Sequence, residues 1–233
     1  EFLHAQRNAA WEEVAKRLAH EIKNPLTPIR LQSERLQRRL TDKLSDEADK
    51  QILGKATGTI IDQVEAMQQI VADFSQIAKP LETRRQSLQL NPLLRQIAEL
   101  YRENHPELDL AEPQRPVHAD PVHIRQILIN LMKNAIEATQ NETTPCIRWR
   151  SYEEGGNIIL DIEDNGPGFA DLTKDPFEPY VTNKPKGTGL GLAIVKKIVH
   201  EHGGTISAGH SRELGGAKIT LTLPATQPVS NTP

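Results

Sequence analysis

A titratable ring and two helix-disrupting residues share one short stretch, RLAHEIKNPLTPIRL, inside a helical pattern. His20, Glu21 and Asn24 stand just before Pro25 and Pro28. A neutral imidazole is a good nucleophile near neutral pH, because the unperturbed pKa of histidine is about 6.5. Asn24 lies one helical turn after His20, so the two share a face on which the amide could orient a water. The stretch therefore suggests nucleophilic chemistry at His20.

The neighbours of His20 suggest how its ring could be prepared. Glu21 could accept a hydrogen bond from Nδ1–H and leave Nε2 to react, but adjacent helical side chains point about 100° apart, so Glu21 must swing back. Pro25 removes a backbone hydrogen bond from the same turn, and a local bend makes a helix deformable. We expect a hinge that presents His20 to different partners. The plain alternative is a solvated surface histidine.

Apolar residues recur with the roughly 3.5-residue spacing of a coiled coil in two segments, 11–36 and 53–77. The polar stretch TDKLSDEADK separates them. This pattern predicts an antiparallel helical hairpin over residues 1–80, with His20 on its outward face. One apolar seam per helix cannot be covered within a single hairpin, so we expect a homodimer in which two hairpins form a four-helix bundle. Packing of the hairpin on the rest of its own chain is the alternative.

The pattern of apolar and polar residues changes after the second apolar segment, 53–77. Residues 81–87 read as a linker, because a proline ends the second helix just before them. Two helices then start at a polar cap followed by proline, with Asn91 and Asp120 as the predicted caps. CIRWRSY and NIILDIED read as strands. The pattern predicts an α+β domain over 88–224, with helices on one face of a mainly antiparallel sheet, and a disordered tail over 225–233.

Composition narrows the functional classes. The chain has 233 residues, 25% of them charged, and a net charge of -3, which argues against nucleic acid as a main partner. The single cysteine, Cys146, fits a reducing cytosol. No run approaches about 18 apolar residues, so we expect no membrane span in this sequence. A helical pattern is under way soon after Glu1, so we expect a fragment of a longer protein, with membrane spans or a sensor upstream.

Three motifs in the second half could together hold a nucleotide. DNGPGF ends a predicted strand and supplies Asp164, Gly166 and Gly168. GTGLGL opens a helix, where glycines let backbone N–H groups approach an anion. Asn130 and Asn134 share a helix face, and their amide oxygens suit Mg²⁺, which takes other ligands from water and phosphates. Each motif alone is more often a plain turn or a pair of surface or capping asparagines, but the three in this order are far more specific.

In this order the motifs resemble the GHKL ATP-binding fold shared by gyrase, Hsp90, MutL and sensor histidine kinases. The resemblance implies an α/β sandwich in which Asp164 accepts a hydrogen bond from the adenine amino group. It implies that Gly166 and Gly168 shape the pocket. Asn130 and Asn134 would hold Mg²⁺ against the phosphates of ATP. The implied residues of the phosphate-side lid are Thr182, Lys184, Lys186, Gly187, Thr188, Gly189, Leu190 and Gly191.

One position separates the branches of that fold. In the ATP-hydrolysing branch a glutamate four residues before the magnesium asparagine serves as base for water, but here that position is Asn130, whose amide cannot accept a proton. HEIKNPL is similar to the phosphoacceptor box of dimeric sensor histidine kinases. The resemblance implies transfer of the γ-phosphoryl group to His20, with Glu21 as general base or orienter and Asn24 positioning water for a phosphatase activity. DPFEPY is similar to the phenylalanine box of these kinases, which implies that Phe177 packs the lid or touches the helical domain.

More narrowly, AAWEEVAKRLAHEIKNPL and EPYVTNKPKGTGLGL resemble nitrogen-regulation sensor kinases of the NtrY type. That family implies a response regulator as partner, NtrX-like, and the cytoplasmic portion of an inner-membrane protein with periplasmic, HAMP and PAS segments upstream. We expect regulator choice to depend on Arg30, Glu34 and Arg38. The alternatives are a GHKL ATPase and a phosphatase-dominated dimeric scaffold.

Overall fold

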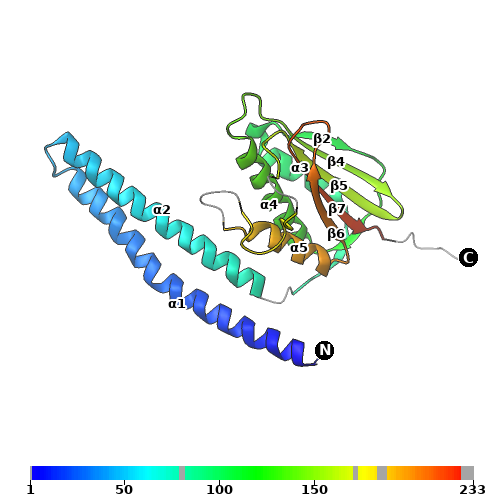
Figure 1. Cartoon of the computed structure of the whole chain (residues 1–233), viewed down its shortest axis with the longest axis horizontal. Coiled ribbons are helices and arrows are strands. Elements are labelled where there is room, and N and C mark those ends of the chain that lie inside the picture. The colour runs from blue at the N-terminus through cyan, green and yellow to red at the C-terminus, as the bar shows by residue number, and fades with distance from the viewer. Residues whose placement is uncertain (1, 79–81, 170–172, 183–187, 227–233) are drawn as a thin grey trace, which may run out of the picture. The chain divides into compact units, whose positions relative to one another are not determined.

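The computed structural model describes residues 2–78, 82–169, 173–182 and 188–226 of the chain (Figure 1). The chain divides into two compact units, a helical hairpin and an α/β module. Within the described residues, no helix has both the length and the apolar composition that crossing a bilayer requires.

Two long helices form the hairpin. Helix α1 spans Phe2–Thr41 and helix α2 spans Glu47–Ala78, and Figure 1 shows them antiparallel and side by side. Asp46 caps α2, because its Oδ1 accepts a hydrogen bond from the backbone N–H of Ala48 at 2.8 Å. The predicted antiparallel helical hairpin is confirmed.

The buried row of the hairpin differs from the predicted seam. Leu26 and Ser33 on α1 and Thr57 and Val64 on α2 are buried. The two hydroxyls donate to carbonyls one turn earlier in their own helices, at 3.0 Å for Ser33 and 2.7 Å for Thr57. The large apolar side chains of the seam that remain exposed are Ile22, Ile29, Leu36, Ile60, Met67 and Ile70. A single hairpin thus leaves a long apolar stripe uncovered.

A five-stranded sheet forms one layer of the second unit. Its strands lie in the order β2, β4, β5, β7, β6. Strands β2 and β4 are parallel, and every other neighbouring pair is antiparallel. The bounds are Glu107–Leu110 for β2, Ile147–Glu154 for β4, Asn157–Asp164 for β5, Thr205–His210 for β6 and Ala217–Pro224 for β7. Strand β5 is central, so its last residue, Asp164, ends a strand that has a neighbour on each side.

Helices cover one face of this sheet (Figure 1). Their bounds are Leu90–Leu100 for α3, Pro121–Thr139 for α4 and Gly191–Glu201 for α5, with a short 3₁₀ turn at Arg102–Asn104. Core side chains that are at most 1% exposed include Ile124, Ile127, Leu131, Trp149 and Leu160. Burying one such side chain stabilises a fold by about 1.5–3 kcal/mol. The expected α+β class, with helices on one face of a mainly antiparallel sheet, is confirmed.

The two predicted helix caps have different outcomes. Asp120 begins α4 and accepts hydrogen bonds from two backbone N–H groups of its first turn, as predicted. Asn91 does not cap α3, because the cap position belongs to Gln89. Instead the Asn91 Nδ2 donates to the carbonyl of Ala111 at 2.9 Å, and its Oδ1 accepts from the Ser151 hydroxyl at 2.6 Å. This buried amide ties α3 to the sheet, a contact that local sequence cannot reveal.

The structure differs from the predicted linker, residues 81–87, at its C-terminal end. Strand β1 spans Gln86–Leu88 and pairs antiparallel with β3, Val117–Ala119, in a small second sheet. Just before β1, the backbone N–H of Arg84 donates to Oδ2 of Asp120 at 2.7 Å. These hydrogen bonds attach the segment to the start of α4.

The predicted disordered tail, residues 225–233, also begins with bonded residues. The backbone N–H and the hydroxyl of Thr226 both donate to the carbonyl of Pro116, at 2.8 Å and 2.9 Å. Residues 227–233 lie outside the described residues. The first part of this prediction is therefore wrong, because the chain stays attached to the module beyond β7.

A buried histidine joins the start of α4 to the end of α5. Nδ1 of His202 lies 2.7 Å from the carbonyl oxygen of Ile198, and Nε2 accepts from the backbone N–H of Asp120 at 3.1 Å. A neutral ring with its proton on Nδ1 satisfies both contacts, whereas a proton on Nε2 would face another donor. Burial lowers the pKa of His202; the Ile198 carbonyl opposes this shift, and the charges of His123 and Arg85 reinforce it.

This lowered pKa predicts a pH-dependent stability. In the unfolded chain His202 titrates near about 6.5, above its folded value, so the unfolded state binds more protons between the two values. We expect stability to be highest above about pH 6.5 and to fall as the pH drops towards the folded pKa. In His202→Gln the Tm should fall less over this pH range than in the parent, because the replaced side chain no longer titrates.

Thermal unfolding followed by circular dichroism from about pH 8 to 5.5 measures the effect. His118 is exposed on β3, so His118→Gln serves as the control and should keep the parent slope. An unchanged slope in His202→Gln would contradict the role of this histidine.

Candidate functional site

The carboxylate of Asp164 ends β5 and is 6% exposed. Its Oδ1 accepts hydrogen bonds from the backbone N–H groups of Gly166, at 2.9 Å, and of Ala217, at 3.2 Å. Both donors belong to the backbone, so they orient the carboxylate without neutralising its charge. A buried acceptor held in this way suits recognition of one hydrogen-bond donor, such as an amino group.

Two glycines allow three segments to meet at Asp164. A Cβ on Gly166 would lie 2.7 Å from the carbonyl oxygen of Ala138 in α4, and a Cβ on Gly216 would lie 2.4 Å from the backbone oxygen of Asp164. A side chain at either position would displace its neighbour. The predicted pocket residue Gly168 lies in the same turn with a φ of +71°. The DNGPGF turn, the end of α4 and the start of β7 therefore converge on one carboxylate.

Gly216 and Ala217 are site residues that the sequence analysis missed. They lie in the segment ELGGAKI, which belongs to none of the three nucleotide motifs. Strand β7 pairs with β5, and Lys218 lies opposite Glu163 in that register, so the pairing carries Ala217 to Asp164. A glycine pair before a strand is the only sequence signal for these two residues. It indicates a site only when β7 is known to lie beside β5.

One face of α4 connects this turn with the two predicted asparagines. Asn134 and Asn130 precede Ala138 by one and two helical turns, and both are half-buried. At the usual helical rise they lie about 6 Å and about 12 Å along α4 from Ala138. This spacing suits a ligand with a base at Asp164 and phosphates beside the asparagines. Their neutral amide oxygens fit Mg²⁺ that takes its anionic ligands from the phosphates.

The described residues include only part of the predicted lid. The lid residues that lie outside the described ones are Lys184, Lys186 and Gly187. Thr182 is exposed, and the Thr188 hydroxyl accepts from the backbone N–H of Leu190 at 3.3 Å. Gly189 has a φ of +67°, and Gly191 is the first residue of α5. A helix start preceded by such a turn directs backbone N–H groups outward, as phosphate binding requires.

An ion pair ties the phenylalanine segment to α5. Nζ of Lys196 lies 2.6 Å from Oδ2 of Asp175 and 5.9 Å from the ring centroid of Phe177. Oδ1 of Asp175 accepts from the backbone N–H of Phe177 at 2.9 Å. The Lys196 ammonium first, and then this N–H, hold the pKa of Asp175 below its usual range. Phe177 is 6% exposed, so it packs as an interior side chain.

His20 lies inside α1, which remains one continuous helix through Pro25 and Pro28. The expected bend therefore does not interrupt the helix. The side chain of His20 lies outside the described residues, whereas Glu21 and Asn24 are exposed. Helical geometry keeps Asn24 on the face of His20 and directs Glu21 about 100° away.

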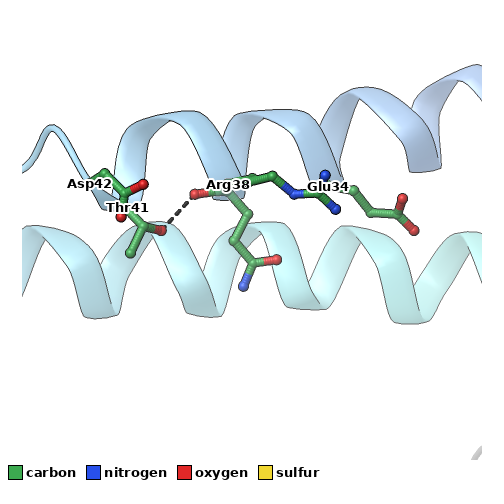
Figure 2. Close-up of a pocket in the computed structure, with 5 residues that line it drawn as sticks. Glu34, Arg38, Thr41 and Asp42 are labelled. Carbon is green, nitrogen blue, oxygen red and sulfur yellow. Dashed lines mark hydrogen bonds between the residues drawn. The ribbon is translucent and has the colours of Figure 1, made fainter.

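A shallow groove of about 420 Å³ opens on α1 near the hairpin turn (Figure 2). Its lining residues are Glu34, Gln37, Arg38, Thr41 and Asp42. Figure 2 shows the hydrogen bond from the Thr41 hydroxyl to the Gln37 carbonyl, at 2.5 Å. Two of the residues predicted to select a regulator, Glu34 and Arg38, line this groove. The third, Arg30, places Nε 3.5 Å from Oε1 of Glu34.

Two family models match the chain one after the other. Residues 10–83 match the His Kinase A (phospho-acceptor) domain. Residues 119–227 match the histidine kinase-, DNA gyrase B- and HSP90-like ATPase. The first match contains His20, and the second contains both predicted asparagines and the surroundings of Asp164.

Individual proteins are similar over nearly the whole chain. Nitrogen regulation protein NtrY of Azorhizobium caulinodans is 40% identical over 98% of this chain, which covers 30% of that protein. The crystal structure of full-length ShkA in complex with AMPPNP is 26% identical, with a TM-score of 0.67 over 92% of this chain and 46% of that one. Histidine kinase ThkA in complex with response regulator protein TrrA is 27% identical, with a TM-score of 0.66 over 95% and 64%. The chain spans about a third of the length of the curated relatives it matches.

The close approach of Gly216 predicts that a single methyl group weakens nucleotide binding. Gly216→Ala should displace the Asp164 carboxylate and raise the Kd for ATP at least about tenfold, which corresponds to about 1.4 kcal/mol. Gly209→Ala is the matched control, because among the described atoms nothing lies within 4 Å of a Cβ at Gly209. Isothermal titration calorimetry measures both, with thermal unfolding as the check on folding. Equal affinities in the two variants would contradict the prediction.

Proposed function

Because the chain belongs to the sensor histidine kinases, with a phospho-acceptor domain ahead of an ATPase-type domain, we propose that it is the core of an ATP-dependent protein-histidine kinase. The γ-phosphoryl group passes from ATP to Nε2 of His20 and then to an aspartate of a response regulator. The observation that carries the proposal is the buried Asp164 carboxylate beside a helix face that presents Asn130 and Asn134. Such a site holds a nucleotide but offers only an amide at Asn130, where hydrolysis needs a base.

The module would hold ATP along α4. Asp164 accepts a hydrogen bond from the adenine amino group, and Gly166 with Gly168 forms the wall beside it. One and two helical turns before Ala138, Asn134 and Asn130 contribute amide oxygens near the phosphates. Mg²⁺, when bound by these amides, would offset negative charge on the phosphates. The first turn of α5, with the Thr and Lys side chains of the lid, provides further donors.

The transfer step needs a nucleophile from the hairpin. The lone pair of Nε2 on His20 forms the new bond to the γ-phosphorus, while the bond to the bridging oxygen of ADP breaks. The ring gains positive charge as this bond forms. Glu21 accepts a hydrogen bond from Nδ1–H and offsets that charge. Asn24, on the face of His20, positions water for the reverse activity, removal of phosphate from the regulator.

The exposed seam of the hairpin supports a homodimer. Ile22, Ile29 and Leu36 on α1 and Ile60 and Met67 on α2 stay exposed in one chain. A second hairpin would cover both stripes and complete a four-helix bundle. Isologous pairing is the usual solution for a self-complementary apolar face.

The partner would be a response regulator of the NtrX type, in a nitrogen-regulation pathway. The ThkA relative was solved with its response regulator, which supports the class of partner. The groove of Figure 2, lined by Glu34 and Arg38 and continued by Arg30, is the surface we assign to regulator choice. The location on the cytoplasmic side of an inner membrane stays a prediction from the NtrY-type resemblance.

His20 supplies the direct test of the kinase. His20→Ala should abolish acid-labile labelling by γ-labelled ATP, a loss of at least about 100-fold, while the Kd for ATP stays within about twofold of the parent. His118→Ala, which changes an exposed histidine of the other unit, should label normally. Labelling that persists in His20→Ala would refute the assignment, and phosphate release without any phosphoprotein would point to an ATPase.

The seam supplies a test of the dimer. Ile60 and Ile52 are both exposed on α2, at 43% and 67%, but only Ile60 belongs to the predicted seam. Each buried isoleucine stabilises an interface by about 1.5–3 kcal/mol, and a homodimer loses two, so Ile60→Glu should weaken dimerisation at least about 100-fold. Ile52→Glu is the control and should stay dimeric. Analytical ultracentrifugation distinguishes them, and equal behaviour of the two variants would contradict the seam as the interface.

A further inference from the structure

The turn between β6 and β7, Ser211–Gly216, is a closed unit. The backbone N–H of Ser211 donates to the carbonyl of Gly216 at 2.9 Å, and the N–H of Gly215 donates back to the carbonyl of Ser211 at 3.0 Å. The Ser211 hydroxyl is buried and accepts from the N–H of Leu214 at 3.0 Å. With its ends bonded to each other, the turn is expected to shift as one piece.

One end of this turn touches the nucleotide-binding carboxylate. Gly216 packs directly against the backbone and Oδ1 of Asp164, and the next residue, Ala217, donates a backbone hydrogen bond to that Oδ1, at 3.2 Å. A displacement of the turn would therefore change both the wall beside Asp164 and the orientation of its carboxylate.

The middle of the turn is held from a distant strand. Oε2 of Glu213 lies 2.7 Å from Nη1 of Arg148 and 3.4 Å from Nη2 of Arg150. Both arginines belong to β4, whereas the turn precedes β7, and β5 lies between these strands. In the β4–β5 register Ile147 is opposite Asp164, so the ion pairs pass over β5 close to its functional end.

The two arginines also form ion pairs with β2, the strand on the other side of β4. Nε of Arg148 lies 2.9 Å from Oε2 of Glu107, and Nε of Arg150 lies 2.9 Å from Oδ2 of Asp109, both on β2. Each guanidinium thus has one carboxylate from β2 and shares Glu213 from the turn. An isolated exposed ion pair contributes little to stability, because both side chains lose entropy when they pair. Guanidinium groups that are already fixed by other carboxylates lose less entropy when they bind one more.

We propose that Glu213 is a positioning residue for nucleotide binding: with Arg148 and Arg150 it holds the Ser211–Gly216 turn over the end of β5 and so keeps Gly216 and Ala217 against Asp164. This inference rests on the proposed function of the site. It adds a residue outside the nucleotide motifs, one that contacts no part of the nucleotide and acts through the turn.

The test compares two carboxylates on the same arginine. Glu213→Gln removes the charge on the side of the turn, and Glu107→Gln removes it on the side of β2; the two side chains are 52% and 54% exposed. Hydrogen exchange of the Gly215, Gly216 and Ala217 amides, without nucleotide, reports the hold on the turn. Calorimetric titration with ATP and Mg²⁺ reports the affinity.

We expect Glu213→Gln to speed exchange at these amides and to raise the Kd for ATP about 3- to 10-fold, while Glu107→Gln leaves both within about twofold. Arg148→Gln with Arg150→Gln should raise the Kd similarly, and adding Glu213→Gln to that pair should cause no further loss, because the shared contact is already gone.

Exchange in Glu213→Gln at the parent rate would overturn the proposal, and so would equal weakening by Glu107→Gln. Faster exchange with an unchanged Kd would show that Glu213 holds the turn but does not position the site, which also overturns it. If the unsubstituted chain does not bind ATP, the proposed function is wrong. The exchange rates then still decide whether Glu213 holds the turn.

Discussion

A single buried carboxylate imposes the main constraint on the α/β module. Asp164 must stay oriented inside the protein, and backbone N–H groups from two different segments hold its Oδ1. Both segments can come this close only because Gly166 and Gly216 lack side chains. Strand β5 is the central strand, with β4 on one side and β7 on the other, and the start of β7 supplies one of these two donors.

In the proposed function, helix α4 sets the distance between the base and the phosphates of a bound nucleotide. Its end contacts the Gly166 turn, and its two asparagines lie one and two turns earlier on a neighbouring part of the same face. Neutral amides can hold a cation against phosphates but cannot take a proton from water. Under the proposed function, a phosphoryl group held there needs another nucleophile, and we propose His20, in the helix that continues through Pro25 and Pro28.

The sequence predicts much of this through local patterns. Heptad spacing identified both long helices, and an aspartate followed by proline identified the Asp120 cap. Asn91 has a similar local pattern but binds Ala111 and Ser151 across the layers, so its role depends on tertiary packing. Gly216 and Ala217 were missed because their role exists only once β7 pairs with β5. The heptad pattern predicts the apolar seam, but it does not predict which residues a single hairpin buries. Those residues are Leu26, Ser33, Thr57 and Val64.

The proposed function depends on Asp164 accepting a hydrogen bond from the adenine amino group, and a comparison of the affinities of two nucleotides tests this most directly. ATP and inosine triphosphate differ at that position, where a carbonyl replaces the amino group. A site built to bond a donor rejects an analogue that lacks it, because the buried acceptor is left facing another acceptor. Calorimetric titration with each nucleotide and Mg²⁺ should give a Kd for ATP at least about tenfold lower than that for inosine triphosphate. Equal affinities would contradict the assignment of Asp164.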